Sequence, residues 1–372
     1  MKNKKNVKLV LTGGHAATTA LSIVEEVIRR EGRKYCWDIY WIGTKKAIEG
    51  KNVHTLESEI FSKIGVKKYS IVAGRLQRKL SIWTLPSLLK MPLGFTQALA
   101  VLLRVKPDVI LSFGGYAAFP VVVVGSLLRI PVILHDQTAG IGRANRLSLP
   151  FAKFVAVSRK GALSLSKKAI LIGNPVMTQI TEISEKEKLS RPPVVFVLGG
   201  SRGSTALNKL IESVLKKLLI DFRLIHIVGP IDYSKFVKLR KGLPSKLKNN
   251  YEIYDRIDPM QIDGVYKRAD IVVSRAGANT VSEIMATKRP AILIPLPISA
   301  PYDQSANAQN AKEFGIATVL DQSDLTPMVL LETIKSVLNS WKSVVGATKG
   351  KKTPDLKASK KLVDLVEDSI GV

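Results

Sequence analysis

The sequence lacks several features that mark extracellular and membrane-spanning proteins. It contains one cysteine, Cys36, which excludes a disulfide framework and fits a reducing compartment. It has no run of 18 or more apolar residues, and the longest candidate, Val121–Leu134, is interrupted by Arg129 and Pro131. We therefore expect neither a membrane-spanning helix nor a secretory signal.

Acidic residues are also scarce. The chain has 57 lysines and arginines against 30 aspartates and glutamates, a formal net charge of +27. Such a charge attracts nucleic acids, anionic lipids and phosphorylated substrates. Aromatic residues make up only 6% of the chain, and the sequence shows no zinc-ligand spacing or aromatic nucleic-acid motif. The lysines are scattered along the whole chain, so a generally basic surface is the alternative to a specific anion site.

The length and the order of the patterns indicate the fold. A chain of 372 residues, 46% of them hydrophobic, is long enough for two domains. Strand patterns alternate with helical patterns, which is typical of parallel sheets covered on both faces. We expect an α/β protein with two Rossmann-like, doubly wound domains that face each other across a cleft. The predicted parts are an N-terminal domain (1–176), a linker (177–193), a C-terminal domain (194–340) and a basic tail (341–372), which is a candidate to pack back on the first domain.

Individual elements follow from the same patterns. The predicted strands are Val7–Leu11, Asp38–Ile42, Val109–Ser112, Pro131–His135, Phe154–Val157, Ala169–Ile172, Val194–Leu198, Arg223–Val228, Tyr251–Tyr254, Ile271–Ser274, Ala291–Pro295 and Ala317–Leu320. The predicted helices are Thr18–Glu31, Thr96–Val105, Pro120–Leu128, Gly142–Leu149, Ser204–Leu219, Gln261–Lys267, Asn279–Ala286, Ser305–Phe314 and Thr326–Ser340.

Four glycine-rich turns each follow a short apolar run and precede a helical pattern, two in each half. They are Thr12–His15, Phe113–Tyr116, Leu198–Gly203 and Ser274–Asn279. Glycine lets the backbone approach a ligand closely, and the helix N-terminus behind it offers N–H groups and positive potential. Two halves with such turns suit an enzyme that joins two substrates.

The second half carries the features of a nucleotide-sugar site. The turn Leu198–Gly203 predicts a diphosphate cradle, to which Ser201 can add a hydroxyl donor; a tight turn without a ligand is the alternative. Glu283 is placed to accept bonds from two vicinal hydroxyls, such as those of a ribose, or else to satisfy its helix dipole. Gln304 and Asn307 suit sugar hydroxyls, although a polar surface loop would have the same composition.

The first half offers two histidines at predicted strand ends. His15 follows Gly13 and Gly14, where a histidine can act as a general base near neutral pH; helix capping is the alternative. His135 ends another apolar strand and is the second candidate.

A segment before the predicted helix at residue 96 combines basic and large apolar residues. This pattern is typical of an interfacial element on an anionic membrane, while a core helix with a basic rim is the alternative. Pro86 and Pro92 argue against one long regular helix here. The candidate membrane contacts are Lys79, Trp83, Leu85 and Leu88.

In their order along the chain, these motifs resemble the MurG family of bacterial N-acetylglucosaminyltransferases, from Val7 to about Leu338. The segments that carry the resemblance are Thr12–His15, Pro107–Ile110 with Gly114–Tyr116, His135–Gln137, Gly173–Val176, Gly199–Ser201, Ser274–Gly277 with Thr280–Glu283, and Gln304 with Asn307. The resemblance implies a family 28 glycosyltransferase of the GT-B fold that needs no metal or cofactor. It implies inverting transfer of N-acetylglucosamine from UDP-N-acetylglucosamine to the muramyl 4-hydroxyl of undecaprenyl-diphosphate-linked N-acetylmuramyl-pentapeptide (lipid I), which gives lipid II.

The resemblance also implies a peripheral protein on the cytoplasmic face of the membrane. Its partners would be the UDP-sugar, a polyprenyl-diphosphate-linked acceptor and an anionic membrane surface, with no nucleic acid. The implied donor-binding residues are Gly199, Gly200, Ser201, Ile257 (near the uracil), Gly277, Ala278, Glu283 (on the ribose), Gln304 and Asn307. The implied acceptor-side residues are Gly13, Gly14, Gly115, Tyr116 and Asn145, with His15 and His135 as catalytic candidates.

Departures from the family pattern fall mainly on the acceptor side. Thr138, Met177 and the pair Ala16-Ala17 replace residues that the family usually has there, which leaves the acceptor lipid open. One alternative is therefore a related inverting transferase with another lipid acceptor, such as a diacylglycerol. A second is a UDP-N-acetylglucosamine 2-epimerase, which shares the two-domain layout, and a third is a nucleic-acid-binding protein, suggested by the charge.

Overall fold

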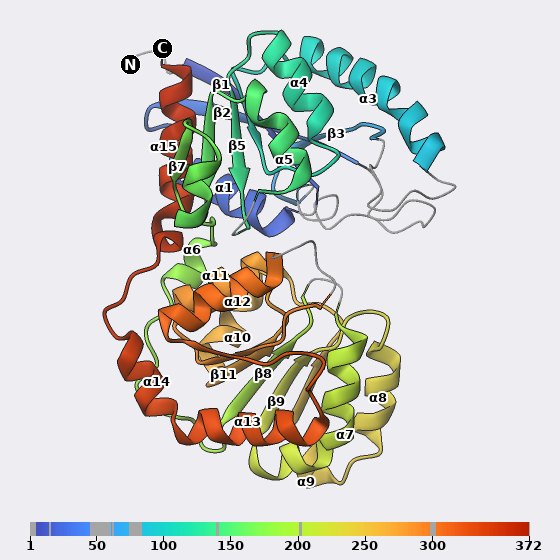
Figure 1. Ribbon diagram of the computed structural model, residues 1–372, viewed down its shortest axis with the longest axis vertical. Helices are drawn as coiled ribbons and strands as arrows, with labels where there is room; N and C mark the ends of the chain where they lie inside the picture. The colour runs from blue at the N-terminus through green and yellow to red at the C-terminus, as the bar shows by residue number, and fades with distance from the viewer. Residues whose placement is uncertain are drawn as a thin grey trace. The chain divides into compact units, whose positions relative to one another are not determined.

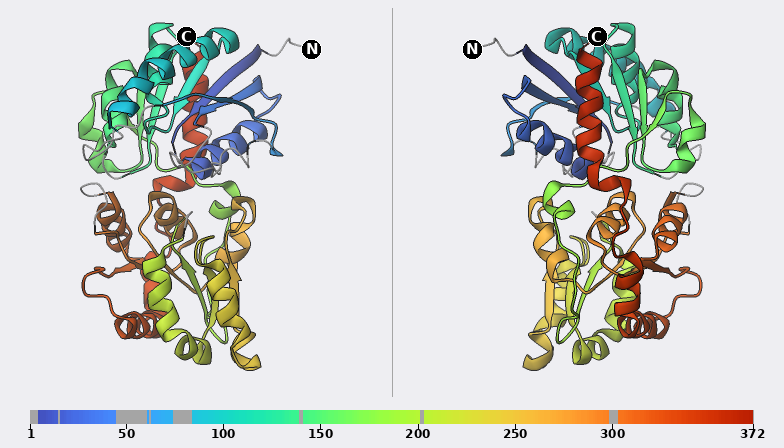
Figure 2. Two further views of the ribbon diagram at one scale, coloured as in Figure 1. Left: turned by 90° about the vertical axis from the view of Figure 1, so that its right-hand side faces the viewer. Right: turned by 90° about the vertical axis from the view of Figure 1, so that its left-hand side faces the viewer.

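A computed structural model describes residues 5–14, 16–44, 61, 63–73, 84–138, 141–200, 203–297 and 303–371, with the main chain alone at 84–90, 143 and 303 (Figure 1). The chain divides into two compact units, Met1–Thr178 with Pro354–Val372, and Gln179–Thr353. Each unit is a parallel sheet between layers of helices, as Figures 1 and 2 show. The predicted α/β class with two parallel sheets is confirmed.

In the described part of the first unit, seven parallel strands follow the order β3-β2-β1-β4-β5-β6-β7. The strands are β1 Lys5–Thr12, β2 Tyr35–Gly43, β3 Lys67–Ser70, β4 Val109–Ser112, β5 Val132–Asp136, β6 Phe154–Val157 and β7 Ala169–Leu171. The helices are α1 Ala17–Arg29, α3 Thr84–Val105, α4 Phe119–Leu127, α5 Arg143–Ser148 and α15 Ala358–Ile370, with 3-10 turns at Leu149–Phe151, Lys160–Leu165 and Pro354–Lys357. The strand order reverses between β1 and β4.

The described part of the second unit repeats this plan with six parallel strands in the order β10-β9-β8-β11-β12-β13. The strands are β8 Val194–Leu198, β9 Arg223–Ile227, β10 Tyr251–Tyr254, β11 Ile271–Ser274, β12 Ala291–Leu293 and β13 Ala317–Val319. The helices are α6 Thr178–Thr181 at the boundary, α7 Thr205–Asp221, α8 Tyr233–Lys241, α9 Ser245–Lys248, α10 Ile262–Arg268, α11 Ala278–Thr287, α12 Asp303–Phe314, α13 Pro327–Asn339 and α14 Trp341–Thr348, with a 3-10 turn at Pro259–Gln261. Here the order reverses between β8 and β11.

Continuous apolar runs explain the central strands. All residues of β4 and β8 are buried, as expected for parallel strands covered on both faces. Helix α7 places Leu207, Ile211 and Leu218 on one face at helical spacing, and these side chains join the core of the second unit. Ser204 caps α7 by accepting a hydrogen bond from the N–H of Leu207.

The last helix, α15, belongs to the first unit although it ends the chain. It lies beside α1, as both views in Figure 2 show. Arg30 of α1 forms ion pairs with Asp364 and Glu367 of α15. Two segments more than 300 residues apart in sequence therefore pack together within one unit.

The structure departs from the sequence-based prediction at α3. This helix runs continuously over Thr84–Val105 with Pro92 inside it, so the expectation that the prolines prevent one long helix is wrong. Packing of α3 on α4, including the edge-to-face pair Phe95–Phe119, holds the helix despite the backbone bond that Pro92 lacks. Among the described residues, no helix is both long and apolar enough to cross a bilayer.

Candidate functional site

The candidate donor site lies at the carboxyl ends of the strands in the second unit. Leu198 of β8 and Ser274 of β11 are paired in register, so the loops that follow them begin side by side. This position, where the strand order reverses, is where open α/β sheets bind their ligands. Two of the predicted glycine turns therefore come together at one point.

The first loop requires glycine at Gly199, Gly200 and Gly203. A Cβ on Gly199 would lie 2.2 Å from the amide nitrogen of Ser204, and one on Gly203 would lie 2.4 Å from the carbonyl oxygen of Val228. Gly200 and Gly203 also have positive φ, a conformation that costs other residues free energy. The result is a close turn that leads into the N-terminus of α7, as a diphosphate cradle requires. Ser201, predicted to bind phosphate, lies outside the described residues.

Arg275, which is not among the predicted site residues, completes this region. Its side chain is only 5% exposed; Nε donates to Oγ of Ser204 over 3.1 Å, and Nη1 donates to the carbonyl oxygen of Ile294. Burial lowers the pKa of Arg275. None of the ion pairs found in the described part of the chain includes Arg275. Its guanidinium therefore places a positive charge beside Ser204, the cap of α7, without a carboxylate among these residues to neutralise it. Its position directly after β11, next to the glycine turn, is the signal that could have identified it.

The second loop ends at an open helix N-terminus. Gly277 caps α11, and a Cβ built on it would meet no atom within 4 Å. The first residue of α11, Ala278, is half-buried. The N-terminal N–H groups of this helix and its dipole favour a negatively charged or hydroxyl-bearing ligand.

Glu283 lies in the second turn of α11 and is half-buried. Its Oε2 accepts a hydrogen bond of 2.8 Å from the hydroxyl of Tyr266 on α10. Burial raises the pKa of Glu283 to about 7, and the hydrogen bond from Tyr266 opposes that rise. The carboxylate is thus held by one partner, with lone pairs left for hydroxyl groups of a ligand.

The remaining donor-side residues surround the same sheet edge. Asn307 is 3% exposed, and its Nδ2 donates to the carbonyl oxygen of Ala276, so it fixes the second glycine loop. Oε1 of Gln304 accepts a hydrogen bond from the N–H of Leu296. Ile257 is half-buried in the segment that follows β10. In this arrangement Asn307 supports the loop, while Gln304 and Ile257 are only partly covered.

The acceptor-side glycines meet at the corresponding point of the first unit. The N–H of Gly14, after β1, donates to the carbonyl oxygen of Gly114, after β4, over 2.9 Å. A Cβ on Gly115 would lie 3.0 Å from the nitrogen of Gly14, and Gly115 has a positive φ of 89°, so the loop after β4 needs glycine here to approach this closely. Gly13 is buried, Tyr116 is half-buried, and His15 lies outside the described residues.

Among the predicted site residues of the first unit, Asn145 and His135 have buried side chains. Asn145 is buried, and its Nδ2 donates to Oδ2 of Asp136 over 2.8 Å. His135 has no exposed surface, and its Nε2 lies 3.0 Å from the carbonyl oxygen of Gly173. Burial lowers the pKa of His135. A general base must reach the hydroxyl from which it takes a proton, so the predicted catalytic role of His135 does not fit this geometry. The side chain instead holds the chain at Gly173.

The predicted membrane segment is described only in part. Lys79 and Trp83 lie outside the described residues, and Leu85 and Leu88 are placed on α3 by their main chain alone. Further along α3, the exposed apolar residues are Leu93, Leu99 and Leu103. Over the part of the chain that the structure describes, no group of three or more potential ligands could hold a metal ion.

Comparison with known proteins agrees with this geometry. The N-terminal domain model of glycosyltransferase family 28 matches residues 12–157, and the C-terminal domain model of the same family matches residues 194–366. The chain is 34% identical over 338 residues to the UDP-N-acetylglucosamine--N-acetylmuramyl-(pentapeptide) pyrophosphoryl-undecaprenol N-acetylglucosamine transferase of Caldanaerobacter subterraneus, which covers 88% of this chain and 89% of that protein.

Solved structures show the same fold. MurG from Acinetobacter baumannii superposes with a TM-score of 0.69 at 24% identity, over 97% of this chain and 99% of that one. The UDP-GlcNAc 2-epimerase of Neisseria meningitidis superposes with a TM-score of 0.62 at 13% identity, over 97% and 99%. Both are likenesses of fold. The two domain models and the relative at 34% identity go further and show that the chain belongs to glycosyltransferase family 28.

Proposed function

We propose that this glycosyltransferase transfers N-acetylglucosamine from UDP-N-acetylglucosamine to the 4-hydroxyl of an N-acetylmuramyl-pentapeptide carried on undecaprenyl diphosphate, the lipid I to lipid II step of peptidoglycan synthesis. The observation that carries the proposal is the set of groups at one sheet edge: the turn Gly199–Gly203, the buried Arg275 and the half-buried Glu283. The name of the relative from Caldanaerobacter subterraneus supports the donor and the acceptor.

In this proposal the donor binds along the edge of the second sheet. The turn Gly199–Gly203, with Ser201, holds the diphosphate at the N-terminus of α7. Glu283 accepts hydrogen bonds from the ribose hydroxyls. The uracil is assigned to Ile257 and the donor sugar to Gln304. Gly277 and Ala278 bring the N-terminus of α11 to the donor. Asn307, predicted to bind the sugar, is buried and supports this loop through the carbonyl oxygen of Ala276 instead.

The reaction is a single in-line displacement. The acceptor hydroxyl oxygen forms a bond to the anomeric carbon while the bond from that carbon to the UDP oxygen breaks, which inverts the configuration. The hydroxyl proton passes to a base, for which His15 is our candidate. Negative charge grows on the departing diphosphate, where the α7 N-terminus and the guanidinium of Arg275 stabilise it, as fixed dipoles and charges do in other transfer enzymes.

We further propose that the protein works as a peripheral protein on the cytoplasmic face of the membrane. The acceptor is anchored in the bilayer, so the enzyme must approach an anionic surface. The exposed leucines of α3 continue the segment that contains Lys79, Trp83, Leu85 and Leu88, and this continuity supports a membrane contact there. Gly13, Gly14, Gly115, Tyr116 and Asn145 would line the acceptor side.

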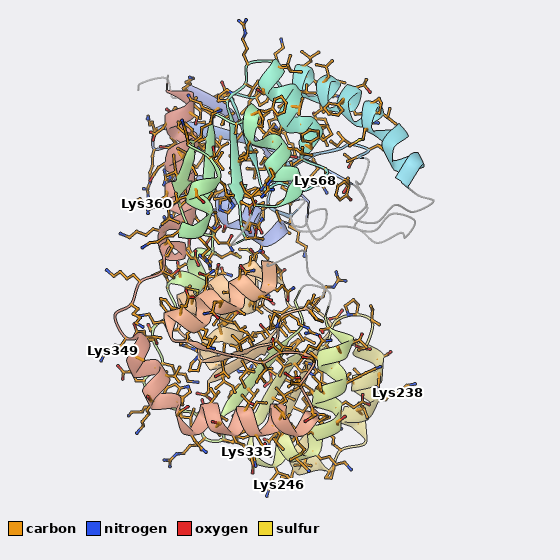
Figure 3. All side chains as sticks on the ribbon, in the orientation of Figure 1. Lys68, Lys238, Lys246, Lys335, Lys349 and Lys360 are labelled. Carbon is orange, nitrogen blue, oxygen red and sulfur yellow. The ribbon has the colours of Figure 1, made fainter. Side chains whose placement is uncertain are left out.

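The basic charge is spread over the surface of both units, which favours general attraction to anions over a nucleic-acid site. In the first unit Lys68 is exposed and Lys360 projects outward, and in the second Lys238, Lys246 and Lys335 project outward (Figure 3). Steeply salt-dependent RNA binding without affinity for UDP would contradict this view.

The test is transfer of labelled sugar. Purified protein is incubated with UDP-N-acetylglucosamine labelled in the sugar and with vesicles that contain the lipid-linked muramyl acceptor. We expect the label in the lipid fraction as a β-1,4-linked disaccharide. Glu283→Ala should lower kcat/KM by about tenfold or more, because it removes hydrogen bonds to a charged group. Glu332→Ala, which changes an exposed glutamate on α13, is the matched control.

Three results would overturn the proposal in different ways. Transfer to diacylglycerol but not to the muramyl lipid would identify another acceptor. Formation of the manno isomer from the donor alone would identify an epimerase, whose fold this chain shares. Full activity of Glu283→Ala would remove this residue from the donor site.

A further inference from the structure

Tyr266 lies behind the proposed ribose site and has not been given a role in it. It is on α10, has no exposed surface, and directs its hydroxyl to Oε2 of Glu283 over 2.8 Å. Glu283 comes from the next helix of the unit, α11, which begins at the open N-terminus capped by Gly277. The contact therefore joins the helix before β11 to the helix after it.

Two contacts, one of the ring and one of the main chain, fix the position of the Tyr266 hydroxyl. The aromatic ring packs edge-on against Phe196 of β8, with centroids 5.5 Å apart and planes at 89°. The carbonyl oxygen of Tyr266 accepts a hydrogen bond of 3.0 Å from Nε of Arg289. Because both the ring and the main chain are held, the hydroxyl has little freedom to move with the carboxylate.

The hydroxyl also keeps its proton. Burial raises the pKa of Tyr266 well above its ordinary value, and the neighbouring charge of Glu283 raises it further. Tyr266 is thus a donor at every physiological pH, and the ionised form of Glu283 is the better acceptor.

A glutamate side chain that recognises two hydroxyl groups must hold its carboxylate plane in one orientation. A free glutamate loses rotational freedom when its ligand binds, which weakens binding. A carboxylate oxygen already bonded to a fixed donor has lost that freedom beforehand. The two carboxylate oxygens offer about four lone-pair positions, so one bond to Tyr266 leaves room for a diol.

We propose that Tyr266 is a positioning residue for donor recognition: its hydroxyl holds Oε2 of Glu283 so that the carboxylate meets the ribose hydroxyls of the UDP-sugar in a fixed orientation. This inference rests on the proposed function, because it takes Glu283 as the ribose-binding group. Tyr266 does not touch the substrate and acts only through Glu283.

The groups that face Glu283 predict how donor binding depends on pH. Among the described residues, Tyr266 is the titratable side chain in contact with this carboxylate. Within the same part of the chain, the guanidinium of Arg289 forms no hydrogen bond with the carboxylate; it donates to the main-chain carbonyl oxygen of Tyr266. With a pKa of about 7, Glu283 must lose a proton to accept bonds from the diol at acid pH. Affinity for UDP-N-acetylglucosamine should therefore fall as the pH drops below 7. The sugar nucleotide suits this measurement because its diphosphate is a diester without the second phosphate ionisation near pH 6.

The experiment is a calorimetric titration of UDP-N-acetylglucosamine, without acceptor, from pH 5.5 to 8.5. Tyr266→Phe keeps the ring against Phe196 and removes only the hydroxyl. We expect roughly tenfold weaker binding at pH 7.5, as for loss of a hydrogen bond to a charged group. The midpoint of the pH profile should move upward, because the bond that lowers the pKa of Glu283 is gone. The kcat at saturating donor should change little.

Tyr251→Phe is the matched control. Tyr251, on β10 of the same unit, is equally buried, and its hydroxyl lies 3.1 Å from Nδ1 of His226 rather than near Glu283. This variant should lose a buried hydrogen bond and some stability but keep the affinity and the pH midpoint of the unaltered protein. A merely structural effect of Tyr266→Phe would look the same as this control.

A double variant tests whether Tyr266 acts through Glu283. In a Glu283→Ala background, Tyr266→Phe should have no further effect on affinity, since the partner is absent. Equal losses in both backgrounds would overturn the inference, as would a flat pH profile of the unaltered protein. If the unaltered protein does not bind the sugar nucleotide, the proposed function fails; if it binds and Tyr266→Phe matches it, only the inference fails.

Discussion

At the scale of single residues, Glu283 serves binding at the expense of stability. Its pKa is about 7 in the folded protein against an ordinary value of 4.5, so the folded state disfavours the ionised form. The contribution of this group to stability is fully present below pH 4.5 and is lost as the pH rises through 7. A buried carboxyl group whose pKa is raised in this way is typical of a functional site.

Glu283→Gln should therefore make the unliganded protein more stable while weakening donor binding. Glutamine can still accept the hydrogen bond from Tyr266 but carries no charge. We expect a gain of about 1–2 kcal/mol at pH 8, allowing for partial solvent access, and a Tm a few degrees higher. At pH 4.5 the gain should vanish, because the glutamate is then largely protonated. Thermal unfolding at both pH values measures this, and a variant less stable than the unaltered protein at pH 8 would contradict it.

At the scale of elements, continuous apolar runs made the central strands predictable from the sequence. The predicted bounds of β4, β8 and β11 are those of the structure. The edge strand β3 was missed because its residues, Lys67–Ser70, are polar and largely exposed, so they carry no apolar pattern. The full length of α3 was missed because a local rule about proline was overridden by packing on α4.

In the candidate site, too, residues that follow a local pattern could be predicted, and contacts between distant elements could not. The glycine turns could be found because each directly follows a strand pattern, and Glu283 because it lies in the helical pattern after one of these turns. Arg275 is part of the motif Ser274–Gly277, but its contact with Ser204 depends on the pairing of β8 with β11, which the local sequence does not show. The contact of Tyr266 with Glu283 joins two helices and has no local signal. The contact of His135 with the carbonyl oxygen of Gly173 likewise joins residues 38 positions apart and has no local signal.

Also at this scale, the glycines of the two donor loops should respond differently to a methyl group. Gly203→Ala combines a positive φ of 76° with a Cβ 2.4 Å from the Val228 carbonyl oxygen, so we expect a loss of at least about 2 kcal/mol in unfolding free energy. Gly277→Ala has an extended backbone and open space, but alanine is a poorer N-cap than glycine, so its stability should fall by no more than about 1 kcal/mol. If α11 faces the donor as proposed, Gly277→Ala should nevertheless weaken UDP-N-acetylglucosamine binding. Denaturant unfolding and calorimetry separate the two effects, and equal stability of both variants would contradict the geometry.

At the scale of the whole molecule, the first unit is completed only by the end of the chain. The 3-10 turn Pro354–Lys357 brings the chain back from the second unit to the first. Its Asp355, 1% exposed, accepts hydrogen bonds from Nη1 and Nη2 of Arg159 over 2.6 and 3.0 Å and from the N–H of Asn174 over 2.7 Å. Gly173 lies so close to this turn that a Cβ there would be 2.7 Å from the carbonyl carbon of Pro354.

This buried pair should be essential to the stability of the first unit but not to donor binding in the second. Asp355→Ala leaves the guanidinium of Arg159 buried without its carboxylate, and we expect a loss of about 3–5 kcal/mol in unfolding free energy. Asp364→Ala removes a partly exposed partner of Arg30 and should cost less than about 1 kcal/mol. Replacing both members, as Arg159→Met with Asp355→Leu, should recover part of the loss: no charge then remains buried, but the N–H of Asn174 loses this acceptor. Affinity for UDP-N-acetylglucosamine, measured at a temperature where all variants are folded, should be the same throughout. A stable Asp355→Ala variant would show that the returning turn is held by packing on Gly173 and not by its charge.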